Sequence, residues 1–352
     1  YFYNNGNDRR AYGVYLVVQE NGITRWGPAF TDNTGCTSAI TLQTGSTYLI
    51  RAFASAKIYN GSLQHLIVKD YNYDVVLDWN QSHSGWSDST DKNIIFGPDE
   101  GTNVMAAASW ALYRHAAGVS SPVYTYLIGS PWCKFSSPDI YLTDDCTDYK
   151  YIISHELGHA ILRAKKGLYS YPEYTFNSVD LDCSCVTASD HKLDSLEYQS
   201  AALNEGWAQF YAATIWNNHS TETDCKFKYY KTVDFNGDGI EESRPVIDCE
   251  VANFSEGLPP YGWEKNYCTD QAVGKGNERD WLVMFWDLAS DLAISVTTVA
   301  QVLVDMPTNW HADEDHLVEE MLNAADGLGI CDASFGWRCY ISGVCSGTND
   351  CP

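Results

Sequence analysis

The sequence predicts two domains, an antiparallel β-sandwich over residues 1–85 and an α+β domain over residues 90–352. Three observations predict this division. Short alternating or β-branched runs separated by turn signals fill the first part, and amphipathic helical periods dominate the second. A polar stretch rich in Ser, Asp and Gly, residues 80–92, lies between them and is typical of a linker or long loop. With 352 residues, 45% of them hydrophobic, the chain can bury two cores.

The strands of the sandwich are predicted at residues 11–19, 37–43, 46–54 and 63–71, with the turn signals ENG, DNTG and YNGS between them. Apolar and polar residues alternate in these runs, or β-branched residues dominate, as is typical of antiparallel sheets with one buried face. We expect a sandwich that resembles the immunoglobulin-like or transthyretin-like kind.

Helical periods in the second domain predict helices at residues 101–118, 148–167, 194–216, 279–293, 296–306 and 313–326. Two short strands, residues 123–129 and 138–145, are predicted between the first and the second of these helices. Helices and strands therefore mix in this part of the chain, which predicts the α+β class.

The formal net charge of −24 bears on the partners of the protein. Nucleic acid and anionic membrane surfaces would repel such a chain, so neither is an expected partner. No apolar run approaches the ~20 residues that a membrane-spanning helix needs. The acidity is typical of a well-solvated surface.

Twelve cysteines, without the paired C-x-x-C knuckles of zinc ribbons, indicate disulfides in an oxidising compartment, and we expect a secreted protein. Cys36 alone lies in the first domain, so either one bridge joins the domains or a thiol in each stays free. The last four cysteines are expected to staple the C-terminal tail; they are Cys331, Cys339, Cys345 and Cys351. Four glycosylation sequons are compatible with secretion; they begin at Asn60, Asn80, Asn218 and Asn253.

Two histidines stand four residues apart in the apolar run DYKYIISHELGHAILRAKKG, residues 148–167. Residues at i and i+4 share one face of a helix, so His155 and His159 can converge on one point. Such a pair offers two imidazoles to a metal, with zinc the expected ion, and Glu156 beside them can act as general base. The alternative interpretation is a pair of ordinary core histidines with satisfied hydrogen bonds.

A zinc site needs a third protein ligand. Asp194 and Glu197 form a capping-box signature, which gives Glu197 a structural role at the start of a helix. Glu205 lies eleven residues beyond Asp194 inside an apolar helix, where a buried carboxylate must be paired or metal-bound. Glu205 is therefore the predicted ligand. The other acidic or imidazole candidates between the two helices are Asp180, Asp182, Asp190 and His191.

The strings HELGHA and LNEGWAQFYA resemble the gluzincin metallopeptidases, and the second is similar to the NEG helix of the zinc aminopeptidase and leukotriene-hydrolase group. The resemblance covers two helices. It implies a zincin-like fold with zinc held by His155, His159 and Glu205, and Glu156 as the base. It also implies that residues 138–145 form an edge strand, along which an extended polypeptide substrate lies by β-augmentation.

The chain departs from the gluzincin pattern in two respects. Forty-five residues separate His159 from Glu205, more than in the familiar members, so an insertion must loop out beside the cleft. Thermolysin-like members carry an aspartate one turn after the ligand glutamate, where this chain has Gln209, which polarises an imidazole less. No match to the exopeptidase motif of the aminopeptidases is present, which favours an endopeptidase.

The resulting hypothesis is a secreted zinc metallopeptidase that hydrolyses peptide bonds with Glu156 as base. Two alternatives stay open. One is a catalytically silent extracellular structural or adhesion protein on the same scaffold, against which the intact Glu156 counts. The other is a zinc hydrolase of a non-peptide bond such as an ester or epoxide. Sequence does not choose the residue that would stabilise the oxyanion; the candidates are His311, His316, Tyr261 and Tyr267.

A second metal motif is the acidic run DFNGDGIEE, which follows the spacing of an EF-hand loop. Pro245 stands at position 12, where an EF-hand has its bidentate carboxylate, so another group must complete the shell. Cys225 and Cys249 flank the loop and could close it by a disulfide. The alternative is an acidic turn without an ion. The expected calcium ligands are Asp234, Asn236, Asp238, Ile240 through its carbonyl, and Glu242.

Overall fold

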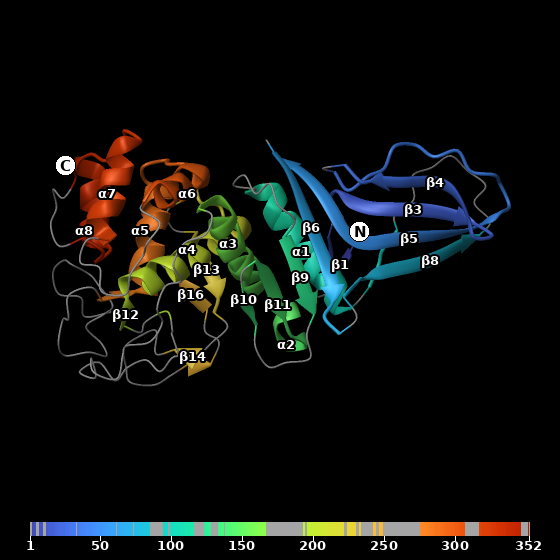
Figure 1. Ribbon diagram of the computed structural model, residues 1–352, viewed down its shortest axis with the longest axis horizontal. Coiled ribbons are helices and arrows are strands. Elements are labelled where there is room, and N and C mark those ends of the chain that lie inside the picture. Colours follow the sequence, from blue (N-terminus) through green and yellow to red (C-terminus); the bar gives the residue numbers. More distant parts are fainter. Residues whose placement is uncertain are drawn as a thin grey trace. The chain divides into compact units, whose positions relative to one another are not determined.

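The computed structural model (Figure 1) describes residues 2–4, 7–9, 12–32, 34–60, 62–72, 74–84, 94–97, 99–115, 123–127, 133–136, 138–166, 193, 196–221, 224–229, 232–233, 242–243, 246–248, 275–306, 317–345 and 351. The chain forms two compact units, unit 1 (residues 1–164) and unit 2 (residues 165–352). The division falls inside helix α3 (Lys150–Lys166), whose last two residues belong to unit 2. The predicted assignment of domains to residues 1–85 and 90–352 stays a prediction.

Unit 1 is built on one nine-stranded sheet with the strand order β10-β11-β9-β6-β5-β3-β4, in which β7 also pairs with β6 and β8 with β5. Strands β1 (Phe2–Asn4) and β2 (Asn7–Arg9) form a separate antiparallel pair. The strands of the main sheet are β3 (Val14–Glu20), β4 (Ile23–Phe30), β5 (Thr47–Asn60), β6 (Ser62–Asp70), β7 (Val75–Val76), β8 (Asp78–Ser84), β9 (Val123–Leu127), β10 (Lys134–Ser136) and β11 (Asp139–Leu142).

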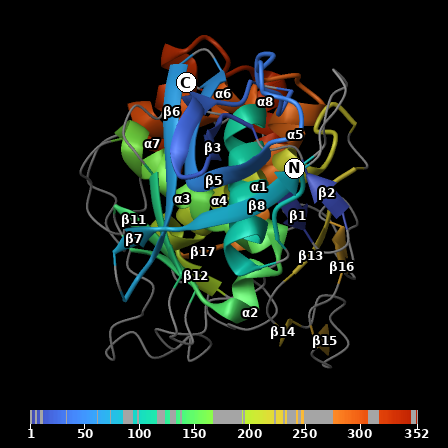
Figure 2. The ribbon, with the colours of Figure 1, turned by 90° about the vertical axis from the view of Figure 1, so that its right-hand side faces the viewer.

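The sheet is mixed, and the predicted antiparallel sandwich is wrong. Strand β9 runs parallel to both β6 and β11, while the other pairs of this sheet are antiparallel. Helix α1 (Glu100–Arg114) is the reason: it lies between β8 and β9 in the chain and packs on β5 and β6 (Figure 2). A helical crossover returns the chain in the same direction, so β9 joins the sheet parallel to β6.

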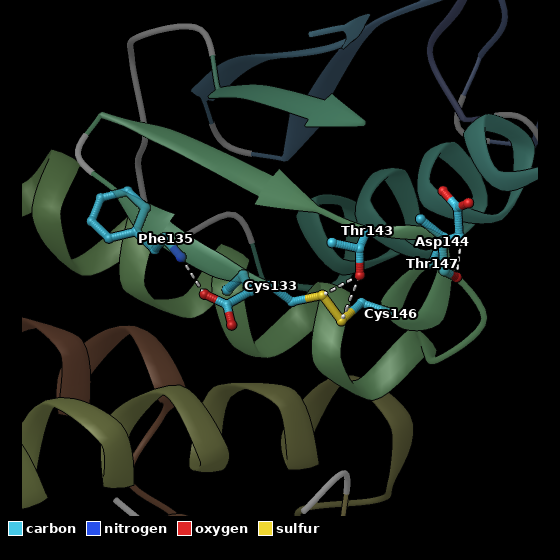
Figure 3. The surroundings of a disulfide bond; sticks show 7 residues. Cys133, Phe135, Thr143, Asp144, Cys146 and Thr147 are labelled. Atoms are coloured by element: carbon cyan, nitrogen blue, oxygen red, sulfur yellow. Dashed lines mark hydrogen bonds between the residues drawn. A yellow bond between two sulfur atoms is a disulfide. The ribbon is translucent and has the colours of Figure 1, made fainter. Parts of the chain in front are cut away.

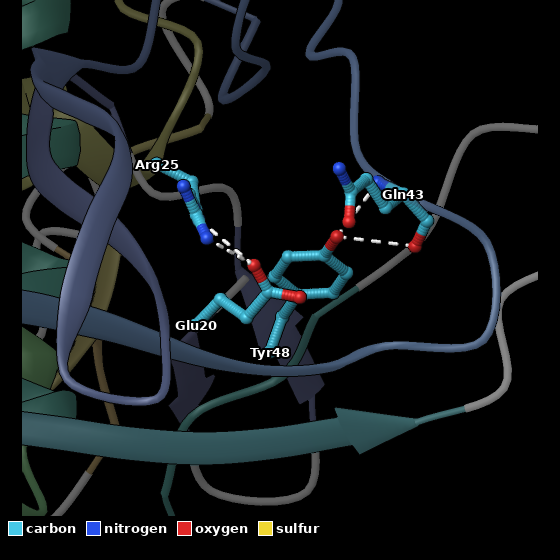
Figure 4. A network of polar contacts seen from close by, with 4 residues as sticks. All are labelled: Glu20, Arg25, Gln43 and Tyr48. Carbon is cyan, nitrogen blue, oxygen red and sulfur yellow. Dashed lines mark hydrogen bonds and ion pairs between the residues drawn. The ribbon is translucent and has the colours of Figure 1, made fainter.

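The predicted turn ENG is confirmed. Asn21 and Gly22 both adopt positive φ, 52° and 76°, between β3 and β4. Two such residues form the tight hairpin turn whose twist matches that of the strands, and Asn-Gly is its preferred sequence. The hairpin is also held by Arg25, which forms an ion pair of 2.7 Å with Glu20 across it (Figure 4).

Two other predictions in unit 1 are wrong. Residues 37–43 form no strand; the backbone N–H and carbonyl of Gln43 bond to the hydroxyl of buried Tyr48 at 2.6 and 3.1 Å (Figure 4). Residues 80–84, predicted as part of a linker, belong to strand β8, which pairs with the first half of β5. This strand carries few apolar residues, because its alternate side chains are exposed and backbone pairing holds it.

Unit 2 is mainly helical. Its helices are α4 (Gln199–Trp216), α5 (Glu278–Ser290), α6 (Val296–Asp305), α7 (Leu317–Gly327) and α8 (Ala333–Ile341), of which α8 was not predicted. Three short antiparallel pairs accompany them: β12 (Leu196–Tyr198) with β17 (Lys275–Asn277), β13 (Lys226–Lys228) with β16 (Val246–Asp248), and β14 (Thr232–Val233) with β15 (Glu242–Ser243). None of the helices in the described part of the chain is long and apolar enough to cross a membrane.

Helices α4 and α5 form the centre of unit 2. The rings of Trp207 and Phe210 on α4 lie 6.4 and 5.7 Å from that of Phe285 on α5, and all three residues are buried. Gly206 allows the close approach, because a Cβ there would lie 2.4 Å from the Cβ of Trp281. A glycine in a helix interior costs about 1 kcal/mol relative to alanine, and here it provides room for a neighbouring helix.

Disulfides support the prediction of an oxidising compartment. Cys225 is disulfide-bonded, and Cys249, its predicted partner, lies outside the described residues. Cys36 is an exposed free thiol, so it does not bridge the two halves of the chain. The three disulfides described in full are Cys133–Cys146 in unit 1, and Cys331–Cys351 and Cys339–Cys345, which staple the C-terminal tail as predicted.

Candidate metal centre

Helix α3 presents His155 and His159 on one face, as their spacing requires. The two imidazole rings meet edge to face, with centroids 4.8 Å apart and planes at 88°. Their Nε2 atoms lie 3.2 Å apart, and the two residues are only 1% and 5% exposed. Apolar residues on the neighbouring faces of the helix, such as Ile152 and Leu157, are also buried. The two nitrogens therefore converge on one place inside the protein.

Glu205 on α4 completes a buried group with these histidines. One ligand atom from each of the three residues lies within 4.8 Å of the other two. Glu205 is 3% exposed, and an unpaired carboxylate in such a place would be costly. The structure thus brings together the three residues that the sequence singled out, in an arrangement compatible with a zincin-like site.

The donor set fits a zinc ion. In a tetrahedral site with zinc–nitrogen bonds of about 2.0–2.1 Å, two nitrogen ligands lie about 3.3 Å apart. The 3.2 Å between the Nε2 atoms of His155 and His159 agrees with that separation. Two imidazoles and one carboxylate are also a ligand set of catalytic zinc sites, in which a fourth position stays open. The group is therefore a candidate metal site whose chemistry favours zinc.

Glu156 is held by the sheet of unit 1. Its carboxylate oxygen Oε2 accepts a hydrogen bond from the backbone N–H of Phe135 at 2.5 Å, and the residue is 5% exposed. Phe135 is the middle residue of β10, and its ring stacks on that of His159 with centroids 6.3 Å apart (Figure 3 shows Phe135 and its surroundings). One residue of the sheet thus contacts both the candidate base and a candidate ligand.

The edge strand implied by the resemblance is wrong by one strand. Residues 138–145 contain β11, which lies between β10 and β9 and is paired on both sides. Among the strands that the structure describes, β10 is the outermost at this end of the sheet. Residue spacing could not distinguish β10 from β11 as the edge strand, because the edge position depends on how the strands pair in the folded sheet.

The predicted capping box at the start of α4 is also wrong. Glu197 lies in β12, where it pairs with Gly276 of β17, and α4 begins at Gln199. A strand partner 79 residues away overrides the local helical preference of this segment. Asp194 lies outside the described residues.

Several other predicted residues lie outside the described part of the chain. They are the alternative ligands Asp180, Asp182, Asp190 and His191, the oxyanion candidates Tyr261, Tyr267, His311 and His316, and the calcium ligands Asp234, Asn236, Asp238 and Ile240. Only the backbone of Glu242, the fifth calcium candidate, is described, in β15. The pairing of β14 with β15 brings the two ends of the predicted calcium loop together.

Gln209, one turn after Glu205, donates from Nε2 to the carboxylate of Glu278 at 3.3 Å. Both residues are fully buried, and Glu278 opens helix α5. From the sequence, Gln209 was predicted only as a partner for an imidazole, and Glu278 was not among the predicted site residues. A buried acid at the start of a helix has an electrostatic reason to be there, because the positive end of the helix dipole favours it.

Lys166 ends α3 with a buried ammonium group. Its Nζ donates to the carbonyl oxygens of Leu303 and Met306, at 2.8 and 2.7 Å, at the end of α6. Burial lowers the pKa of Lys166 to about 8, although Glu320 and Asp305 act in the opposite direction. The end of α3 is thereby tied to the helical core of unit 2.

No protein-family model matches the chain, and no curated protein matches it in sequence. The function is therefore inferred from the site itself.

Proposed function

We propose that the protein is a zinc metallopeptidase, an endopeptidase that cleaves polypeptides outside the cell. The observation that carries the proposal is the buried group of His155, His159 and Glu205, with Glu156 directly after the first histidine. The disulfides are consistent with the extracellular location.

When bound, zinc would polarise the scissile carbonyl and lower the pKa of a water molecule towards ~7. The two histidines and Glu205 would hold the ion through two nitrogens and one oxygen. Glu156 is the residue suited to take the proton from the water and to return it to the leaving nitrogen. Its low exposure, 5%, would keep bulk water from competing for that proton.

An extended polypeptide is the substrate class that the fold favours. Strand β10 is the edge strand of the sheet as far as the chain is described, and it directs a backbone N–H towards Glu156. Sheet edges bind extended peptides through their free backbone groups, which a small ester or epoxide would not need. The edge strand beside the candidate base therefore favours a peptidase over a hydrolase of small molecules.

The proposal is tested by metal analysis of the purified protein and by digestion of casein with and without a chelator. We expect about one zinc per chain, loss of cleavage on chelation and recovery on addition of zinc. Glu156→Gln should keep the metal and the fold and reduce turnover by a factor of about 10² to 10⁴, the usual contribution of a general base. Glu319→Gln, the same change at an exposed position of α7, is the matched control and should leave cleavage unchanged.

The alternatives give different results in the same experiment. A silent scaffold would bind zinc without cleaving casein or an ester substrate, and a non-peptide hydrolase would cleave the ester alone. Comparable activity of Glu156→Gln and the unmodified protein would remove Glu156 from its role as base.

A further inference from the structure

Within the described part of the chain, strand β10 pairs with β11 on one side and with no strand on the other, outward side. It pairs with β11 through Lys134–Tyr141, Phe135–Ile140 and Ser136–Asp139. In an antiparallel pair, alternate residues direct their backbone groups towards the partner strand and away from it. The N–H of Phe135 points away from β11, because it donates to Glu156. Phe135 is therefore the residue of β10 that offers an outward backbone donor.

The outward donor is the group that an incoming strand would use. Peptides add to a sheet edge by placing their own carbonyl oxygens on its outward N–H groups. Here the carboxylate of Glu156 occupies that donor at 2.5 Å, in a charge-assisted hydrogen bond that is stronger than one to a neutral carbonyl. A peptide carbonyl at this position and Glu156 must compete for the same hydrogen.

The strand is anchored beside the contested donor. The disulfide Cys133–Cys146 joins the residue before β10 to helix α2 (Asp144–Thr147), and Thr143 Oγ1 lies 3.2 Å from Cys133 Sγ (Figure 3). The ring of Phe135 is stacked on His159. Because these contacts hold the strand in place, we expect the side chain of Glu156, and not strand β10, to move when a peptide binds.

We propose that the ligand-free protein keeps Glu156 on the Phe135 N–H, and that an extended polypeptide substrate displaces it on adding to β10, which releases the carboxylate to act as base. Phe135 is then a positioning residue that couples occupation of the edge strand to the readiness of Glu156. Substrates too short to reach Phe135 would bind without releasing Glu156. This inference rests on the proposed function.

The first test measures the affinity of an uncleavable peptide, a casein fragment that the protein cuts, resynthesised with the scissile amide N-methylated. Glu156→Ala removes the competing acceptor, so the zinc-loaded variant should bind the peptide about tenfold more tightly than the unmodified protein. The gain should persist in a Phe135→Ala background, which keeps the N–H. It should vanish in Phe135→Pro, which lacks the N–H and is tolerated on an edge strand.

Two results of the affinity test would overturn the coupling. Equal affinity of the unmodified protein and Glu156→Ala would show that Glu156 and the peptide do not compete. An equal gain in Phe135→Pro would assign the effect to the lost charge alone. In both cases casein cleavage could continue, so the proposed function would survive. Failure to cleave casein at all would overturn the proposed function and this inference with it.

A second measurement does not depend on the proline variant or on turnover. In protein labelled with ¹⁵N-phenylalanine, the Phe135 amide signal is identified by its loss in Phe135→Ala. The signal should move in Glu156→Gln, which weakens the hydrogen bond, and in the unmodified protein on addition of the N-methylated peptide. An unchanged Phe135 signal in Glu156→Gln would overturn the inference.

Discussion

Gly206 is the position at which a single methyl group should test the packing beneath the candidate site. It follows Glu205 directly on α4, and α5 crosses it closely. In Gly206→Ala the new Cβ would lie 2.4 Å from Trp281 Cβ and 2.8 Å from the carbonyl oxygen of Glu278. These atoms belong to the backbone or are bonded to it, so they cannot rotate out of the way.

The cost of this substitution follows from the distances. Carbon atoms in good contact lie about 3.5–4.0 Å apart, so α4 and α5 would have to separate by about 1 Å. Overpacking costs about 1–3 kcal/mol, and the upper part of that range applies because the clash involves main-chain atoms. The higher helix propensity of alanine offsets about 1 kcal/mol of this loss in stability. The net loss should be about 2 kcal/mol, or about 4–8 °C in Tm for a unit of this size.

Thermal unfolding and zinc titration against a chelator are the assays for Gly206→Ala. Because Glu205 must move with α4, we expect zinc affinity to fall about tenfold together with Tm. Gly327→Ala is the matched control: it lies at the end of α7, and a Cβ there would meet no atom within 4 Å. Its Tm should be unchanged or slightly raised, and its zinc affinity should be unchanged. Unchanged Tm in Gly206→Ala would refute the predicted clash between α4 and α5. Unchanged zinc affinity would show that a shift of α4 does not affect metal binding.

Three other predictions concern stability. Replacing Cys133 and Cys146 by alanine removes a crosslink between residues 13 apart and should lower the unfolding free energy in urea by about 3 kcal/mol, whereas Cys36→Ser, at an exposed free thiol, should not. The pKa of Lys166 is about 8 in the folded protein and 10.5 ordinarily, so between pH 8 and 10.5 the unfolded chain binds more protons than the folded one. The unfolding free energy should therefore rise with pH over this range. An equal rise in Lys166→Met would contradict the prediction. Removing calcium with zinc held constant should lower Tm, because calcium at a hundredfold excess over its Kd would raise the unfolding free energy by about 2.7 kcal/mol. Unchanged melting would show that loop 234–242 is an acidic turn without an ion.

Features that depend on a residue's own preferences could be predicted from the sequence. Asn21 and Gly22 tolerate positive φ, and the hairpin turn between β3 and β4 follows from that tolerance. His155 and His159 share a face because a helix has 3.6 residues per turn, whatever surrounds it. Glu205 was singled out by the cost of burying a carboxylate in an apolar helix, and the structure places it with the histidines.

Features that depend on distant partners appeared only in the tertiary structure. Glu197 lies in a strand because β17 pairs with β12, and residues 78–84 form a strand because β5 is there to receive them. The hydrogen bond from Phe135 to Glu156 depends on the register between β10 and β11, since a shift of one residue would turn the N–H inwards. Helical period and turn preference act over a few neighbouring residues, whereas pairing and register are decided by segments that meet only when the chain has folded.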